Sequence, residues 1–271
     1  MTVAVDRRAA PQPALPRRRA RWRRAAWACA LAAIAVQMAF PFTGGGTLLL
    51  TAGSVLLLAG AAVLHAGAVG GRLAAGVLAL VAGGGGLLAE AVGVHTGVPF
   101  GAYAYRGTLG VEVLGVPALV PLAWVMMAWP ALVVARLLVP RHAVARIVVG
   151  AWALTAWDVF LDPQMVDLGH WSWAHPTPAL PGVAGIPLTN FAGWLVVSLL
   201  IVGTLDRLVP PTSRSTGVPV AVYLWTFGSS VLAHAAFFGR PPVALVGGLL
   251  MGLVAIPLAL RTARDVRRRR A

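Results

Sequence analysis

The sequence predicts an all-α fold, a polytopic transmembrane helical bundle of about eight spans with both termini in the cytoplasm. Composition is the first of three observations behind this prediction. Of the 271 residues, 59% are hydrophobic and only 11% are charged, whereas soluble domains carry about 25% charged residues. The second is the length of the apolar runs, which match the ~20 residues of a bilayer-crossing helix. The third is the placement of arginine, which sets the orientation.

Eight apolar runs are separated by turn-forming residues. Typical breaks are Gly70-Gly71-Arg72 and Arg240-Pro241-Pro242. The predicted helices cover residues 25–41, 47–69, 73–94, 116–138, 144–161, 189–208, 218–238 and 241–260. The transmembrane domain therefore spans 25–260, between a basic cytoplasmic tail at 1–24 and a second one at 261–271.

All 22 basic residues are arginine, and the net charge is +14. With the amino terminus inside, 20 arginines fall on inner segments, and only Arg106 and Arg240 fall on outer ones. Arginine concentrates on the cytoplasmic side of membrane proteins, so this split supports eight spans across the cell membrane. The two tails are expected to touch anionic lipid headgroups. Nucleic-acid binding is not expected, because basic and aromatic residues do not interleave outside the tails.

The first apolar run, 25–41, follows an arginine-rich start, as in a secretory signal peptide. It ends in Phe40-Pro41-Phe42 and not in the small residues of a cleavage site. We therefore expect a retained membrane helix. The single cysteine, Cys29, lies in this run, so no disulfide is predicted.

Two connections are much longer than the turns between the other helices. They cover residues 95–115 and 162–188, fall on the outer side and are rich in glycine, proline and aromatic residues. Long loops that are neither charged nor of low complexity tend to be functional. Five of the eight acidic residues lie in these loops or at the adjoining helix ends. Together these features predict a site on the outer side.

Two aspartates, Asp158 and Asp162, stand at the outer end of the predicted helix 144–161 and are followed by Pro163. Residues four apart lie on one helix face, and the proline is expected to end the helix. A carboxylate inside a span costs about 2.5–3.5 kcal/mol on insertion scales, so it is a functional hypothesis by default. The alternative is that both aspartates only cap loop amides or face lipid headgroups.

Glu90 lies one turn from the outer end of the predicted helix 73–94. It continues a stripe of small residues, Ala79, Gly83 and Gly86, against which a neighbouring helix can pack closely. Its side chain should therefore point into the bundle. The glycine run 83–86 should also loosen the helix locally. A purely structural role for Glu90 as a hydrogen-bond acceptor is the alternative.

Aromatic side chains gather at the level of these acids. Trp and Tyr belts are normal at membrane interfaces, but the bias toward the outer side also fits a π-lined pocket that stabilises a cation. Asn190, near the start of the predicted helix 189–208, is expected to cap that helix or to orient a water. The candidate binding residues are Tyr103, Tyr105, Trp124, Trp157, Trp171, Trp173, Asn190 and Trp194.

Signatures of several other activities are missing. The sequence has no phosphate-binding loop, no dinucleotide-binding glycine fingerprint and no HExxH motif. His170 and His175 lie five apart in the second long loop without an evident third ligand. A metal site is thus left open but unsupported.

Several short stretches carry a resemblance to a known family. They are Glu90 to Tyr105, Leu109-Gly110, Val116-Pro117, Pro121 to Trp124, Trp157 to Pro163, Gly169 to Trp173, and Gly185 to Trp194. In this combination, residues 85–200 resemble the integral-membrane carotenoid biosynthesis family that includes bisanhydrobacterioruberin hydratase and the γ-carotene and lycopene 1,2-hydratases. Residues before 70 and after 210 look like ordinary membrane helix.

The resemblance implies a hydro-lyase that adds water across the terminal C1–C2 double bond of an acyclic carotenoid. Protonating that alkene makes a tertiary carbocation, so the reaction needs an acid shielded from bulk water, where a carboxyl group keeps its proton more readily. We expect Asp158 to be the principal acid and Asp162 its partner, which shares or passes the proton, with Glu90 as the alternative acid. The aromatic faces and a second carboxylate would stabilise the cation. The expected partners are the lipid-dissolved carotenoid, water, membrane lipid and other carotenoid enzymes. No cofactor is required.

Other functions fit parts of the pattern. Asp158 and Asp162 resemble half of the pyrophosphate–magnesium motif of membrane prenyltransferases and lycopene elongases, but the second acidic pair of that motif is missing. Carboxylates inside a bundle also occur in transporters and proton channels, which would predict inverted repeats, and we find none. A scaffolding role in a carotenoid enzyme assembly is the remaining alternative.

Overall fold

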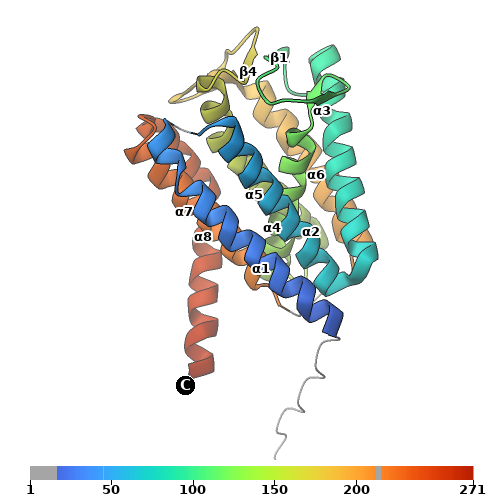
Figure 1. The fold of residues 1–271 in the computed structure, drawn as a ribbon. Coiled ribbons are helices and arrows are strands. Elements are labelled where there is room, and N and C mark those ends of the chain that lie inside the picture. Colours follow the sequence, from blue (N-terminus) through green and yellow to red (C-terminus); the bar gives the residue numbers. More distant parts are fainter. Residues whose placement is uncertain (1–16, 45, 212–214, 271) are drawn as a thin grey trace, which may run out of the picture.

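The computed structural model describes residues 17–44, 46–211 and 215–270 as a bundle of long helices (Figure 1). The helices are α1 (Arg17–Gln37), α2 (Leu48–Leu78), α3 (Gly85–Thr96), α4 (Leu119–Leu138), α5 (Ala143–Asp167), α6 (Leu188–Leu208), α7 (Gly217–Ala236) and α8 (Pro241–Arg270). A 3-10 helix, η1 (Phe40–Thr43), follows α1, and a π-helical segment, η2 (Ala79–Gly84), joins α2 to α3. Within the described residues, six helical runs are long and apolar enough to cross a membrane. The predicted helical membrane protein is thereby confirmed.

The longest of these runs, Leu48–Thr96, traverses the bundle twice. Gly71 has φ 79° and ψ −176°, a backbone conformation that glycine adopts without strain. The chain reverses direction there, and its second arm continues through η2 into α3 (Figure 1). The predicted break at residues 70–72 is therefore a turn inside one continuous helical run. The predicted loosening near residues 83–86 is also present, as the wider turns of η2.

Small residues let α1 pack closely along α2. Ala26, Ala30 and Ala33 of α1 are at most 1% exposed. A Cβ atom on Gly67 of α2 would lie 1.9 Å from the ring of Trp22, so that ring packs directly on the backbone of α2. Such contacts between small residues are the usual way in which membrane helices approach each other.

The outward faces of the helices are apolar. Along α8 a stripe of large aliphatic side chains is between 55% and 66% exposed, formed by Leu245, Leu249, Leu253, Ile256 and Leu260. Soluble monomers rarely expose contiguous apolar patches of this extent. The stripe therefore fits contact with lipid acyl chains.

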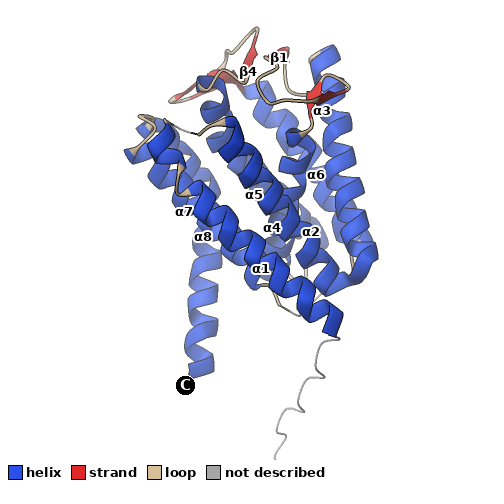
Figure 2. Cartoon of the chain, in the orientation of Figure 1, coloured by secondary structure: helices blue, strands red, loops and turns tan. Residues whose placement is uncertain are grey.

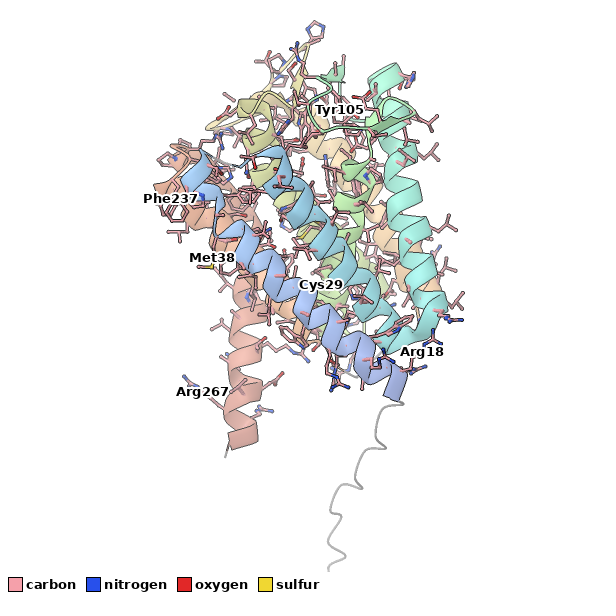
Figure 3. The ribbon with its side chains drawn as sticks, viewed as in Figure 1. Arg18, Cys29, Met38, Tyr105, Phe237 and Arg267 are labelled. Atoms are coloured by element: carbon pink, nitrogen blue, oxygen red, sulfur yellow. The ribbon has the colours of Figure 1, made fainter. Side chains whose placement is uncertain are left out.

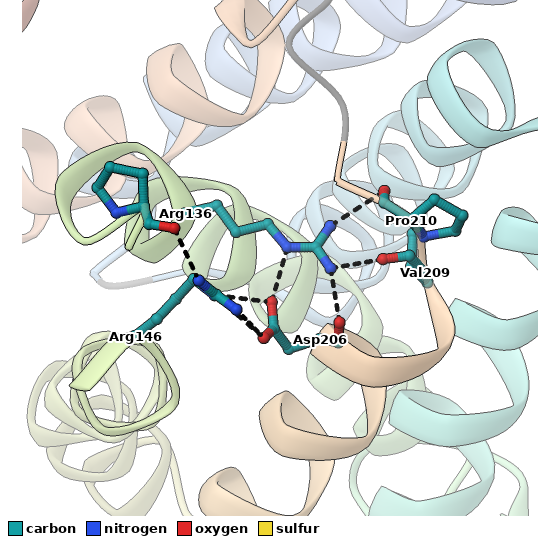
Figure 4. A network of polar contacts seen from close by, with 6 residues as sticks. Arg136, Arg146, Asp206, Val209 and Pro210 are labelled. Carbon is teal, nitrogen blue, oxygen red and sulfur yellow. Dashed lines mark hydrogen bonds and ion pairs between the residues drawn. The ribbon is translucent and has the colours of Figure 1, made fainter. Parts of the chain in front are cut away.

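The two ends of the bundle differ in chemistry. Figure 3 shows Arg18 and Arg267 at the end opposite Tyr105. At that arginine end Asp206 of α6 pairs with Arg136 of α4 at 2.8 Å and with Arg146 of α5 at 2.7 Å. Arg136 also donates to the carbonyl oxygen of Val209 (Figure 4). This network holds three helices together where they leave the apolar zone.

Three two-stranded antiparallel sheets lie at the other end, which we call the strand end (Figure 2). The pairs are β1 (Tyr103–Tyr105) with β4 (Trp171–Trp173), β2 (Glu112–Val113) with β3 (Val116–Pro117), and β5 (Ala179–Leu180) with β6 (Val183–Pro187). The sequence analysis did not predict these strands, and the described chain is nevertheless predominantly helical. Strands of two to five residues are too short for polar–apolar alternation to be recognised.

The predicted end of the fifth helix was also wrong. α5 continues through Pro163 to Asp167, although the proline was expected to stop it. A proline in a helix interior removes one hydrogen bond and costs about 3 kcal/mol. Here Asp162, Pro163 and Met165 are all buried, so packing of this extra turn offsets that cost. The extra turn keeps Asp162 inside a regular helix.

Candidate functional site

A cavity of about 80 Å³ lies at the strand end, between β1 and β4 and the adjoining ends of α2 to α6. A single water needs roughly 10–15 Å³ on this measure, so the space accepts several waters or a small branched apolar group. Nine of the eleven predicted site residues line this cavity. The two that do not are Asp158 and Trp157.

Glu90 of α3 accepts three side-chain hydrogen bonds at the cavity wall. The phenol oxygens of Tyr103 and Tyr105 donate to its Oε2 at 2.5 and 3.0 Å. The indole Nε1 of Trp124 donates to its Oε1 at 3.1 Å. Every one of these partners is a donor, and Glu90 is 4% exposed, so the arrangement is built to solvate a carboxylate anion in place of water.

Glycines on α3 set how closely these partners approach. A Cβ atom on Gly86 would lie 2.5 Å from Trp124, and one on Gly93 would lie 2.8 Å from Phe100. The predicted small-residue stripe is confirmed, because α4 packs directly against it. Glu90 thereby points into the bundle, as expected, and reaches a tryptophan 34 residues further along the chain.

Asp158 and Asp162 share one face of α5, as predicted, and Asn190 of α6 bridges them. Its Nδ2 donates to Asp158 Oδ2 at 2.9 Å and to Asp162 Oδ2 at 2.5 Å. The indole of Trp171 donates to Asp162 Oδ1 at 3.0 Å. Because one amide nitrogen bonds to both, the two carboxyl groups lie close together, and neighbouring carboxyl groups seldom ionise at the same time. The pair is therefore a place where a proton is held.

The two aspartates have different access to the cavity. Asp162 is 3% exposed and lines it, whereas Asp158 is fully buried one helical turn deeper. The Oδ1 atom of Asp158 has no hydrogen-bond partner among the described residues. Asp162 is thus the member of the pair that a molecule in the cavity meets.

Aromatic rings share the remaining wall with aliphatic side chains. Trp124 and Trp194 stack with ring centroids 3.9 Å apart and an interplanar angle of 13°. Trp157 meets the edge of Trp194 at 6.1 Å from outside the cavity wall. It therefore supports a wall ring and does not itself face the cavity.

The β1–β4 ribbon covers the cavity with four more rings. Its register pairs Tyr103 with Trp173 and Tyr105 with Trp171. Alternation along a strand sends these four side chains to one face. Burial and the negative charge of Glu90 raise the pKa of Tyr105 well above its ordinary value of 10.0. Its phenol therefore keeps the proton that it donates to Glu90.

The histidines of the second long loop take no part in the cavity. His170 Nδ1 lies 2.7 Å from the hydroxyl of Thr108, a contact that ties the two long loops together, and burial lowers the pKa of His170. His175 is exposed. In the part of the chain that the structure describes, no group of three or more His, Cys, Asp or Glu side chains is placed to hold a metal ion.

Thr51 and Val55 of α2 also line the cavity, and the sequence analysis did not single them out. They lie in the stretch before residue 70, which looked like ordinary membrane helix. An uncharged hydroxyl costs little in a membrane helix and leaves no mark on composition. A pattern of apolar runs therefore has no means of selecting Thr51.

Fold and site together define a polytopic helical membrane protein with an aromatic, carboxyl-bearing cavity at one end of its bundle. The chain matches the sequence model of a family described as carotenoid biosynthesis protein over residues 45–254. It belongs to this family, and its role lies in carotenoid biosynthesis. Curated proteins and solved structures gave no match. The match confirms the predicted family and extends beyond the stretch 85–200 to include Thr51.

Proposed function

We propose that the protein is a carotenoid 1,2-hydratase, a hydro-lyase that adds water to the terminal C1–C2 double bond of an acyclic carotenoid without a cofactor. One observation carries the proposal. A single apolar cavity at one end of a membrane bundle combines an aspartate pair, a carboxylate held by three donors and a wall of aromatic rings. Family membership supports the pathway, and the cavity supports acid-catalysed chemistry on an alkene.

Protonation of the alkene is the first step. The π electrons of the double bond take a proton at C2, which leaves a tertiary cation at C1. Asp162 faces the cavity, so it is the group that gives up this proton to the substrate. Asp158 was expected to be the principal acid, but its position behind Asp162 suits a partner that shares the proton of the pair. Asn190 keeps both carboxyl groups in place.

The cation then needs stabilisation until water reaches it. A desolvated cation over an aromatic face gains about 2 kcal/mol or more, and four tryptophans line the cavity. Glu90 supplies a negative charge whose oxygens are fixed by three donors. A preorganised countercharge of this kind stabilises charge as it develops, without reorganisation during the reaction.

Capture by water completes the reaction. The oxygen of a water bonds to C1, one of its protons stays in the new hydroxyl group, and the other returns to the aspartate pair. The product is a tertiary alcohol, and the protein regains its starting protonation. Only the end of the carotenoid needs to enter a cavity of about 80 Å³, while the polyene remains in lipid.

We also propose that the protein sits in the cell membrane with eight spans, both termini cytoplasmic and the cavity toward the outer leaflet. Arg18 and Arg267, near the two ends of the described chain, both lie at the end of the bundle opposite Tyr105. Their position supports this orientation (Figure 3). A carotenoid dissolved in the outer leaflet would then reach the cavity at its own depth.

Expression in a bacterium that makes lycopene tests the proposal. We expect a new carotenoid heavier by one water, identified by mass spectrometry. Asp162→Asn removes the proton and keeps the shape, so the yield should fall by roughly 10²–10⁴-fold, the usual contribution of general acid catalysis. Immunoblots of the membrane fraction should show the variant at the normal level.

Glu112→Gln is the matched control for this experiment. Glu112 is an exposed acid at the strand end and lies outside the cavity. Its loss should leave the yield of hydrated carotenoid unchanged. If the wild-type protein accumulates in the membrane and yields no hydrated carotenoid, the hydratase proposal fails.

A further inference from the structure

Thr51 lines the cavity, and its hydroxyl group has no hydrogen-bond partner among the described residues. Thr51 stands in the first turns of α2 and is 9% exposed. Its Oγ1 atom is buried, and no hydrogen bond joins it to any described residue. A buried hydroxyl group without a hydrogen bond destabilises the fold. We therefore expect Thr51 Oγ1 to form a hydrogen bond with a molecule that enters the cavity.

A threonine in a helix can bond its hydroxyl group to the backbone of the same helix, but Thr51 does not. Threonines in apolar helices commonly donate to the carbonyl oxygen four residues earlier. The carbonyl oxygen of Thr47 accepts the backbone amide of Thr51 at 2.8 Å, but not its hydroxyl group. The hydroxyl is thus left with one hydrogen to donate and two lone pairs to accept.

Other polar groups of the wall are already engaged. The Nδ2 atom of Asn190 bonds to both aspartates, and both oxygens of Glu90 accept from aromatic donors. The residue of α2 that follows Thr51 on the wall, Val55, is apolar. Thr51 therefore supplies a free hydrogen-bonding group on a helix that carries neither the acid nor the countercharge.

We propose that Thr51 is a positioning residue that holds the attacking water of the hydration reaction. This inference rests on the proposed hydratase function. The water donates one hydrogen to Thr51 Oγ1, which leaves an oxygen lone pair free to form the C1–O bond. As that bond forms, one proton stays in the product hydroxyl and the other returns to the aspartate pair. Thr51 itself gains and loses no proton in this step.

The cation has two fates, and Thr51 affects only one of them. Capture by water gives the alcohol. Loss of a proton from a carbon next to C1 regenerates an alkene. In heavy water the proton first added comes from an exchanged carboxyl group, so the regenerated alkene carries deuterium. The ratio of alcohol to deuterated alkene therefore reports how well the water is positioned.

Membranes that contain each variant, incubated with lycopene in heavy water, provide the test. Thr51→Val keeps the branched shape and removes the hydroxyl. We expect the yield of hydrated carotenoid to fall by about tenfold, as for the loss of one transition-state hydrogen bond. Deuterium in the recovered alkene should persist or increase. Thr51→Ser restores a hydroxyl and should regain most of the hydration.

The controls separate this inference from the function on which it rests. Asp162→Asn should lose both the alcohol and the deuterium. Thr51→Val with a wild-type yield of alcohol would overturn the role of Thr51, and so would Thr51→Val that loses alcohol and deuterium together at a normal membrane level. Wild-type membranes that give neither alcohol nor deuterated alkene would overturn the hydratase itself, and the role of Thr51 with it.

Discussion

At the scale of single residues, hydrogen-bond partners distinguish the carboxyl groups of the cavity. Glu90 meets only donors, two phenols and one indole. Asp162 meets two donors and a second carboxyl group. Pairs of acids in different environments are how one site holds a proton donor and an anion together. Under the proposed mechanism, the same chemical group, a carboxyl, thus serves two roles within one small cavity.

Tyr103 and Tyr105 should keep their protons in alkaline solution. Burial and the charge of Glu90 raise the pKa of both phenols above 10.0. In the unfolded chain both would ionise near pH 10. The fold should therefore lose stability as the pH rises above about 10, because the unfolded chain releases protons that the folded chain retains. An ultraviolet titration in detergent measures this ionisation directly.

A Tyr223→Phe variant simplifies that measurement, since the chain has three tyrosines. At pH 10 the folded variant should show no tyrosinate absorbance, and denaturation at the same pH should produce it. Tyrosinate absorbance from the folded variant at pH 10 would show that the donors to Glu90 are in contact with water.

At the scale of elements, the helices were predictable and the strand end was not. Apolar runs with glycine and proline breaks located the long helices, and the reversal at Gly71 occurs at the predicted break. The predicted tails were wrong in part, because α1 already begins at Arg17 and α8 continues to Arg270. Expectations failed where local rules compete with packing. Pro163 did not stop α5, because its turn is buried. The β1–β4 ribbon joins segments nearly 70 residues apart, and no local pattern records such a pairing.

The sequence revealed those cavity residues whose insertion into a membrane costs free energy. Carboxyl groups inside spans are expensive, so Glu90, Asp158 and Asp162 stood out from the sequence. The inward orientation of Glu90 followed from the small-residue stripe that the structure confirms. Thr51 was missed, and so was the order of the aspartates, because exposure to a cavity depends on how α2 and α5 are placed around it.

Disrupting the β1–β4 ribbon should impair the cavity without unfolding the bundle. Ala104 is exposed and pairs with Ser172, between Tyr103 and Tyr105, which both donate to Glu90. Ala104→Pro removes a backbone donor from the ribbon, and prolines are excluded from paired positions in strands. We expect hydration to fall by about tenfold, comparable to the loss of one hydrogen bond to a charged group. The level of the protein in the membrane should be normal.

Ala104→Thr is the matched control. It changes the same exposed position, keeps the backbone donor and has a high strand propensity, so hydration should stay at the wild-type level. Equal activity of the proline and threonine variants would show that the ribbon does not position the tyrosines for function.

At the scale of the whole molecule, the arginine network and the cavity occupy opposite ends of one bundle. The network of Arg136, Arg146 and Asp206 fixes three helices at the arginine end (Figure 4). At the strand end apolar side chains stand out from the loops, with Val111 77% and Leu114 64% exposed. Under the proposed function, a lipid-dissolved end group would approach the cavity across this exposed apolar surface.

The eight-span topology is open to a direct test with reporter fusions. Green fluorescent protein is fluorescent inside a bacterial cell, whereas alkaline phosphatase is active outside it. With the cavity facing outward, fusions after residues 72 and 142 should be fluorescent, because both positions lie at the arginine end. Fusions after residues 110 and 175, in the two long loops of the strand end, should give phosphatase activity.

The fusion after residue 72 is the most informative, since it depends on the reversal at Gly71. Phosphatase activity after residue 72 would show that the run Leu48–Thr96 does not cross the membrane twice as predicted. Phosphatase activity after residue 142 together with fluorescence after residue 175 would place the cavity in the cytoplasmic leaflet.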